Sequence, residues 1–149
     1  MIRQEWDRIQ VAEGKKDEEI LVLVHGPPAS GKTTLATQLS NELDLPHLSR
    51  DILTEWLCDS VDDPDSSLAS ALCHVGYDMM FKVAGELSKG KGSFLLEGCI
   101  NPVSGGKRLL QTINTDNQDI IEIFITARDE ILLERYYNRA GSKNRHEAH

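Results

Sequence analysis

A short glycine-containing stretch near the start of the chain constrains the fold more than any other feature. The pattern G-x-x-x-x-G-K-[ST] is matched by Gly26-Pro27-Pro28-Ala29-Ser30-Gly31-Lys32-Thr33-Thr34. Its glycines allow the backbone to curl so that successive N–H groups face a polyphosphate. The lysine of such a loop reaches the β- and γ-phosphates, and the hydroxyl that follows it ligates Mg²⁺. The stretch therefore predicts a phosphate-binding loop.

The residues on either side of this loop favour a strand before it and a helix after it. Residues 20–24 form a short apolar run that includes β-branched side chains, as in a buried parallel strand. After the loop, Leu35, Leu39 and Leu43 recur at helical spacing. A helix N-terminus favours an anion, so we expect the loop to bind a nucleoside triphosphate.

Short apolar runs and longer helical patterns alternate along the rest of the chain. Strands are expected at about 20–25, 45–49, 93–97 and 120–125, and helices at about 31–43, 50–58, 66–88, 103–113 and 129–139. This alternation predicts an α/β fold with a parallel sheet and right-handed crossovers. In the helix at 66–88, the face expected to be buried carries Leu68, Leu72, Val75, Met79, Val83 and Leu87.

Length and composition restrict the class of protein. The chain has 149 residues, which suffices for one domain with one core. Its net charge of −8 argues against a general nucleic-acid binder. No apolar run is long enough for a membrane span, and the polar N-terminus does not resemble a signal peptide. The three cysteines lack metal-binding spacing and are expected to be free thiols in a reducing cytoplasm.

Two acidic residues lie where predicted strands end. Asp51 follows the second strand and Glu97 closes the third. Ligands of open parallel sheets bind beyond the carboxyl ends of the strands, so both should approach the triphosphate. We expect Asp51 to be the base that accepts a proton from an attacking hydroxyl, and Glu97 to hold a metal-bound water or substrate. The alternatives are a helix N-cap for Asp51 and a solvent-facing acid for Glu97.

The last predicted helix carries Arg135 and Arg139, which lie four residues apart and therefore on one face. Arg145 follows in a polar segment. Mobile arginines of a lid can deliver positive charge to a transferring phosphoryl group and exclude water. The alternative is a surface helix in which Glu130 and Glu134 pair with these arginines.

Several motifs together resemble the small P-loop kinases and kinase-like ATP-binding proteins, among them polynucleotide 5′-kinase domains, chloramphenicol phosphotransferase and zeta toxins. The matching segments are 20–34, Leu48-Ser49-Arg50-Asp51, Phe94-Leu95-Leu96-Glu97-Gly98, Asn101, 125–135 with Arg139, and 144–149. The resemblance implies a three-layer P-loop NTPase fold with helices on both faces of a sheet of about four strands. It also implies ATP and Mg²⁺ as cofactors.

The resemblance implies roles for individual residues. In this group the residue matching Asp51 activates the acceptor hydroxyl, the first lid arginine packs on the adenine and the second reaches phosphate. Catalytic roles are thus expected for Lys32, Asp51 and Arg139. Nucleotide contacts are expected from Gly26, Ala29, Ser30, Gly31, Lys32, Thr33, Thr34 and Arg135. Substrate contacts are expected from Arg50, Asp51, Glu97 and Asn101, and Mg²⁺ contacts from Thr33 and, through water, Glu97.

Two departures from the group qualify this expectation. Polynucleotide kinases carry an arginine three residues past the base, where this chain has Thr54. Members of the group also continue past the lid into a fifth strand and a helix. We therefore expect a 1–19 extension followed by a kinase-like domain at 20–149 that is truncated at the lid.

The expected activity is ATP-dependent transfer of the γ-phosphoryl group to a hydroxyl of a small molecule, without nucleic-acid or membrane partners. Two alternatives stay open. One is an ATP-binding or ATPase module without a metabolic acceptor, and the other is a polynucleotide 5′-hydroxyl kinase.

Overall fold

A computed structural model describes residues 19–90, 92–101, 103–113 and 118–140 of the chain. The predicted 1–19 extension, apart from residue 19, lies outside this range, as do Arg145 and the 144–149 lid continuation. The elements in chain order are β1 (Glu19–His25), α1 (Lys32–Leu43), β2 (His47–Ser49), α2 (Arg50–Asp59), α3 (Ser66–Lys89), β3 (Phe94–Gly98), α4 (Ser104–Thr112), β4 (Gln118–Phe124) and α5 (Asp129–Ala140). Each predicted strand and helix in this range is present, with small shifts at its ends.

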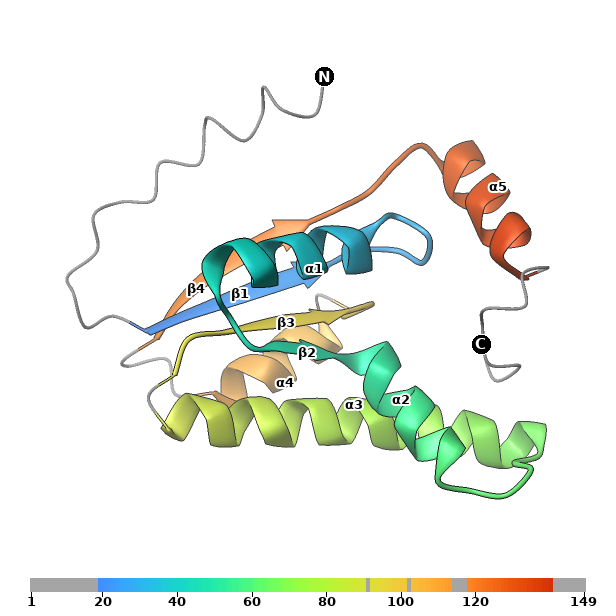
Figure 1. Ribbon diagram of the computed structural model, residues 1–149, viewed down its shortest axis with the longest axis horizontal. Helices are drawn as coiled ribbons and strands as arrows, with labels where there is room; N and C mark the ends of the chain where they lie inside the picture. The colour runs from blue at the N-terminus through green and yellow to red at the C-terminus, as the bar shows by residue number, and fades with distance from the viewer. Residues whose placement is uncertain (1–18, 91, 102, 114–117, 141–149) are drawn as a thin grey trace.

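The strands form one parallel sheet in the order β2-β3-β1-β4. Helix α1 covers one face of the sheet, whereas α3 and α4 cover the other (Figure 1). The predicted α/β fold with helices on both faces is confirmed. Because the strands are parallel, their carboxyl ends meet at one edge, which we call the carboxyl edge. In Figure 1, α2 and α5 both lie beyond this edge.

The central strand β1 is buried on both faces, which explains its continuous apolar sequence. Leu21 and Leu23 enter the core beneath α3 and α4, where the other buried members are Leu53, Met80, Phe81, Ala84, Phe94, Leu96, Ile100, Leu109 and Ile113. Val22 and Val24 point to the opposite face and pack with Ala36 and Leu39 of α1 and Leu95 of β3. One strand therefore connects both halves of the core.

The α3 helix buries a different face from the one expected. Leu68, Val75 and Met79 are exposed by 41%, 41% and 37%, so the prediction that they share the buried face is wrong. The buried positions of α3 are instead Ala69, Gly76, Met80, Phe81, Ala84, Gly85 and Ser88. Most of these positions carry small residues, which allow neighbouring helices to approach closely. A leucine-based periodicity does not detect such a contact.

Gly76 shows how close this approach is. A Cβ atom at Gly76 would collide with the Thr54 hydroxyl of α2, and one at Gly85 would lie 2.8 Å from Thr112 Cγ2 of α4. Thr54 is fully buried and its hydroxyl donates to the Arg50 carbonyl at 3.1 Å. The contact between α2 and α3 therefore sets where the first turn of α2 lies.

Within the described residues, no helix is both long and apolar enough to cross a membrane.

Replacing Gly76 by alanine should destabilise the protein, whereas the same exchange at Gly106 should not. Both exchanges gain the helix propensity of alanine, about 1 kcal/mol. At Gly76 the new methyl group meets Thr54, and overpacking of this kind costs about 1–3 kcal/mol, whereas the space around Gly106 is open. Denaturant unfolding of both variants measures the difference. Equal effects of the two exchanges would contradict the close α2–α3 contact.

Candidate active site

The loop between β1 and α1 has the conformation that its glycines permit. Gly26 has φ 148° and Gly31 has φ 101°, values that residues with a Cβ rarely adopt. A Cβ at Gly26 would also collide with the carbonyl oxygen of Ile125, whose N–H donates to the His25 carbonyl at 2.9 Å. Ala29 is held at φ 63°, which is uncommon for a residue other than glycine. The start of the loop is thus pressed against the segment that follows β4.

The loop holds polar groups ready for an anion. Lys32 is only 6% exposed, and its ammonium donates to the Pro27 carbonyl at 2.7 Å within the same loop. The Ser30 hydroxyl is buried and makes no hydrogen bond within the described residues. Buried donors without a strong acceptor are costly, and an anion at the N-terminus of α1 would satisfy them. The geometry therefore fits a phosphate-binding loop.

Glu97 connects three elements at the carboxyl edge. It is 1% exposed, so the alternative of a solvent-facing acid is wrong. Its Oε2 accepts a hydrogen bond from the Ser49 hydroxyl of β2 at 2.7 Å, and its Oε1 accepts one from the Thr33 hydroxyl of α1 at 3.3 Å. His47 Nε2 lies 3.7 Å from Oε2. The carboxyl group of β3 thus reaches the base of the phosphate loop.

This arrangement fits a magnesium ion held mainly by phosphate. Mg²⁺ prefers oxygen ligands and keeps several waters, so it needs few protein groups. Thr33 would bind the ion through its hydroxyl, and Glu97 would hold one of its waters. Within the described ranges, no group of three or more His, Cys, Asp or Glu side chains forms a separate metal site.

Asp51 lies in the first turn of α2, and the N-cap of this helix is Ser49. The alternative that Asp51 caps the helix is therefore wrong. Its carboxylate accepts a hydrogen bond from Arg50 Nη1 at 2.7 Å. Burial lowers the pKa of Arg50, but the hydrogen bond and charge of Asp51, with smaller contributions from Tyr77 and Cys73, together outweigh this effect and raise the pKa, so Arg50 stays charged. The guanidinium also lies over the Tyr77 ring, 4.6 Å from its centroid.

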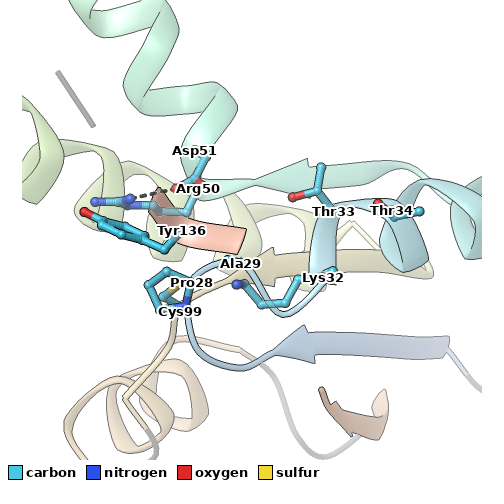
Figure 2. A pocket seen from close by; sticks show the side chains of 10 residues that line it. Pro28, Ala29, Lys32, Thr33, Thr34, Arg50, Asp51, Cys99 and Tyr136 are labelled. Atoms are coloured by element: carbon cyan, nitrogen blue, oxygen red, sulfur yellow. Dashed lines mark hydrogen bonds and ion pairs between the residues drawn. The ribbon is translucent and has the colours of Figure 1, made fainter. Parts of the chain in front are cut away.

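A cavity of about 190 Å³ lies between the phosphate loop and the first turn of α2, beyond the carboxyl edge. It is lined by Pro28, Ala29, Gly31, Lys32, Thr33, Thr34, Arg50, Asp51, Cys99 and Tyr136. In Figure 2, Lys32, Thr33 and Thr34 lie toward one side of the view, whereas Arg50, Asp51 and Tyr136 lie toward the other. The structure thus brings together the predicted phosphate loop and the predicted base.

Other predicted site residues lie outside this cavity. Asn101 Oδ1 accepts hydrogen bonds from the backbone N–H groups of Val103 and Ser104 at the start of α4. It lines a neighbouring hollow of about 370 Å³ rather than the cavity itself. Arg135 is exposed and is not a lining residue. Arg139 belongs to α5, but its side chain lies outside the described part of the chain.

Sequence reasoning missed Tyr136 and Cys99 as lining residues. Tyr136 adjoins the arginine that the family resemblance singled out, so the pattern indicated the correct turn of α5 but not the side chain. Cys99 follows the end of β3, and the general rule for strand ends could have found it.

The family follows from the sequence of nearly the whole chain. A family model described as an AAA domain matches residues 21–149. The chain belongs to the AAA domain family. Among curated proteins, none matches this AAA domain chain in sequence.

Solved structures similar to this AAA domain protein include kinases. A protein from Chloroflexus aurantiacus j-10-fl, provisionally classed as a kinase, has a TM-score of 0.79 and 25% identity, over 90% of this chain and 72% of its own. A structure of the Pnkp1/Rnl/Hen1 RNA repair complex has a TM-score of 0.67 and 18% identity, over 90% of this chain and 42% of the matched chain. Shikimate kinase from Acinetobacter baumannii has a TM-score of 0.53 and 21% identity, over 83% of this chain and 64% of the matched chain.

These findings confirm the resemblance to the P-loop kinase group and support a phosphotransferase in general. The chain spans less than half of the matched chain in the RNA repair complex.

Replacing Ser49 by alanine should lower the free energy of unfolding by about 1–3 kcal/mol, because the buried Glu97 carboxyl group loses a hydrogen-bond donor. Ser60→Ala is the matched control, since that exposed hydroxyl donates to the Trp56 carbonyl at 2.7 Å. This control should change stability by less than about 0.5 kcal/mol. Chemical denaturation of both variants tests the role of Glu97, and equal losses would contradict it.

Proposed function

We propose that the protein is an ATP-dependent phosphotransferase that moves the γ-phosphoryl group of ATP to a hydroxyl of a small molecule. The observation that carries this proposal is one cavity lined by both Lys32 and Asp51. The lysine belongs to the phosphate loop, and the carboxylate is a group that can accept a proton. Transfer to a hydroxyl needs both in one space.

Each of these groups has a distinct part in the proposed reaction. The loop amides and Lys32 stabilise the negative charge of the γ-phosphoryl group. Asp51 orients the acceptor hydroxyl and takes its proton. The hydroxyl oxygen then bonds to the γ-phosphorus while the bond from this phosphorus to the β-phosphate oxygen breaks, and ADP leaves with that electron pair. Magnesium bound at Thr33 and, through water, Glu97 would neutralise charge on the phosphates.

The surroundings of the cavity and the charge of the chain favour a small acceptor over a polynucleotide. Thr54, which replaces the arginine of polynucleotide kinases, is fully buried and does not line the cavity. The net charge of −8 also repels a phosphate backbone.

Helix α5 is the proposed lid. Tyr136 already lines the cavity from this helix, and α5 lies beyond the carboxyl edge in Figure 1. Its neighbour Arg135 is proposed to pack on the nucleotide base. Arg139, one helical turn further, is proposed to reach phosphate when the lid closes.

Replacing Lys32 by alanine should lower turnover at least about a hundredfold, because the transferring phosphoryl group loses its ammonium partner. ADP release in the presence of an acceptor mixture measures the loss, and circular dichroism checks the fold. Lys82→Ala removes an exposed lysine of α3 and serves as the control. Wild-type turnover in the Lys32 variant would refute the assignment.

Replacing Asp51 by asparagine should slow transfer to the acceptor by about 10²–10⁴-fold and leave ATP affinity nearly unchanged, since only the proton acceptor is lost. Asp78→Asn is the matched control, because Asp78 also pairs with an arginine, Arg108, at 2.7 Å but lies outside the cavity. Equal losses in ATP affinity and transfer would argue against a base. Label from γ-labelled ATP that appears only in inorganic phosphate would favour an ATPase module instead.

A further inference from the structure

The Arg50 guanidinium is held in place at the acceptor end of the cavity. Its Cζ lies 4.6 Å from the centroid of the Tyr77 ring, and its Nη1 donates to Asp51 at 2.7 Å. The Tyr77 hydroxyl in turn donates to the Cys99 carbonyl at 2.6 Å, which fixes the ring to the end of β3. With 15% of its side chain exposed, Arg50 would lose little conformational freedom when a ligand binds.

Backbone packing enforces this position. A Cβ at Gly98 would lie 3.3 Å from the Arg50 Cβ, so the end of β3 comes close to the start of α2. On the other side, the absence of a side chain at Gly76 lets α3 approach Thr54 and brings Tyr77 beneath the guanidinium. Arg50 is therefore part of a rigid corner.

The Arg50 guanidinium has N–H groups that its contact with Asp51 does not use. Arg50 Nε is buried and makes no hydrogen bond within the described residues, so a ligand in the cavity can reach only the outer N–H groups of the guanidinium. A guanidinium presents its N–H groups in a planar fork, and the carboxylate of Asp51 uses one arm of it. Of the charged side chains that line the cavity, Lys32 belongs to the phosphate loop, so Arg50 is the cation that lies beside Asp51. A carboxylate is a planar anion that can accept hydrogen bonds from the outer N–H groups of this guanidinium.

We propose that the acceptor is a short hydroxy acid whose carboxylate binds Arg50 while its hydroxyl faces Asp51. This inference rests on the proposed transferase function. Arg50 and Asp51 are joined at 2.7 Å, so the two acceptor groups that they bind must be separated by only a few bonds. The carboxylate is unchanged in the reaction. The hydroxyl oxygen gains the phosphoryl group and its proton passes to Asp51.

Binding of small acids to the full chain tests this proposal without the need for turnover. The protein is saturated with Mg²⁺ and a non-hydrolysable ATP analogue, so that the phosphate loop is filled. Glycerate, lactate, malate and tartrate are then titrated calorimetrically, each against its methyl ester, with glycerol as a further neutral probe. At least one acid should bind about tenfold or more tightly than its ester, because only the acid can make a charge-assisted contact with Arg50.

Variants separate recognition of the acid from general effects. Arg50→Gln should abolish the preference for acid over ester, and Arg50→Lys should keep only part of it, because a lysine has the charge without the fork. Arg108→Gln is the matched control. Arg108 also pairs with a carboxylate at 2.7 Å and lies 5.1 Å from the Phe81 centroid, but it lines the neighbouring hollow. This control should keep the preference, and thermal unfolding checks that each variant folds.

The outcomes distinguish this inference from the proposed function. The hydroxy-acid proposal is overturned if no acid binds more tightly than its ester, or if Arg50→Gln leaves the preference intact. It is also overturned if Arg50→Gln slows transfer to acids and alcohols equally, since Arg50 would then only position Asp51. Acid binding that depends on Arg50 without any phosphoryl transfer keeps the acid site and overturns the transferase function.

Discussion

Burial of β1 on both faces of the sheet is the constraint on which the rest of the structure depends. Its alternate side chains enter the two halves of the core, so the strand has one position and one register against β3 and β4. The phosphate loop begins where this strand ends. Because Gly26 also presses against Ile125, the start of the loop is fixed from two sides. A flexible glycine-containing segment thereby acquires a single shape.

The buried carboxyl group of Glu97 adds a second constraint at the same edge. Burial of such a group is unfavourable unless hydrogen bonds satisfy it, and here hydroxyls from β2 and α1 donate to its two oxygens. The β2 strand is short, and this contact ties its last residue to β3. The position of Asp51, two residues later, follows from it. Packing and polar contacts therefore agree on where the proposed base lies.

The sequence predicted the parts of the fold that depend on local pattern. The loop motif, the apolar strands and the helical spacing each depend on residues that are close together in the sequence, and the elements that they predicted are present. The buried face of α3 was predicted wrongly, because small residues such as Gly76 and Gly85 pack there against helices distant in sequence. The contact between Arg50 and Tyr77 could not be predicted either, because the sequence around one of these residues does not indicate the other. On α5, Tyr136 lines the cavity, whereas the neighbouring Arg135, for which a nucleotide contact was expected, does not.

The two ends of the cavity are built from different parts of the chain. Ala29, Gly31, Lys32, Thr33 and Thr34 of the phosphate loop line one part of the cavity, and the left-handed backbone at Ala29 and Gly31 shapes this loop. The proposed acceptor end consists of side chains from the first turn of α2, the residue after β3 and Tyr136 of α5, supported by the Tyr77 ring of α3. In the proposed reaction, exchanges in the first turn of α2 would therefore alter the choice of acceptor while leaving the phosphate loop intact.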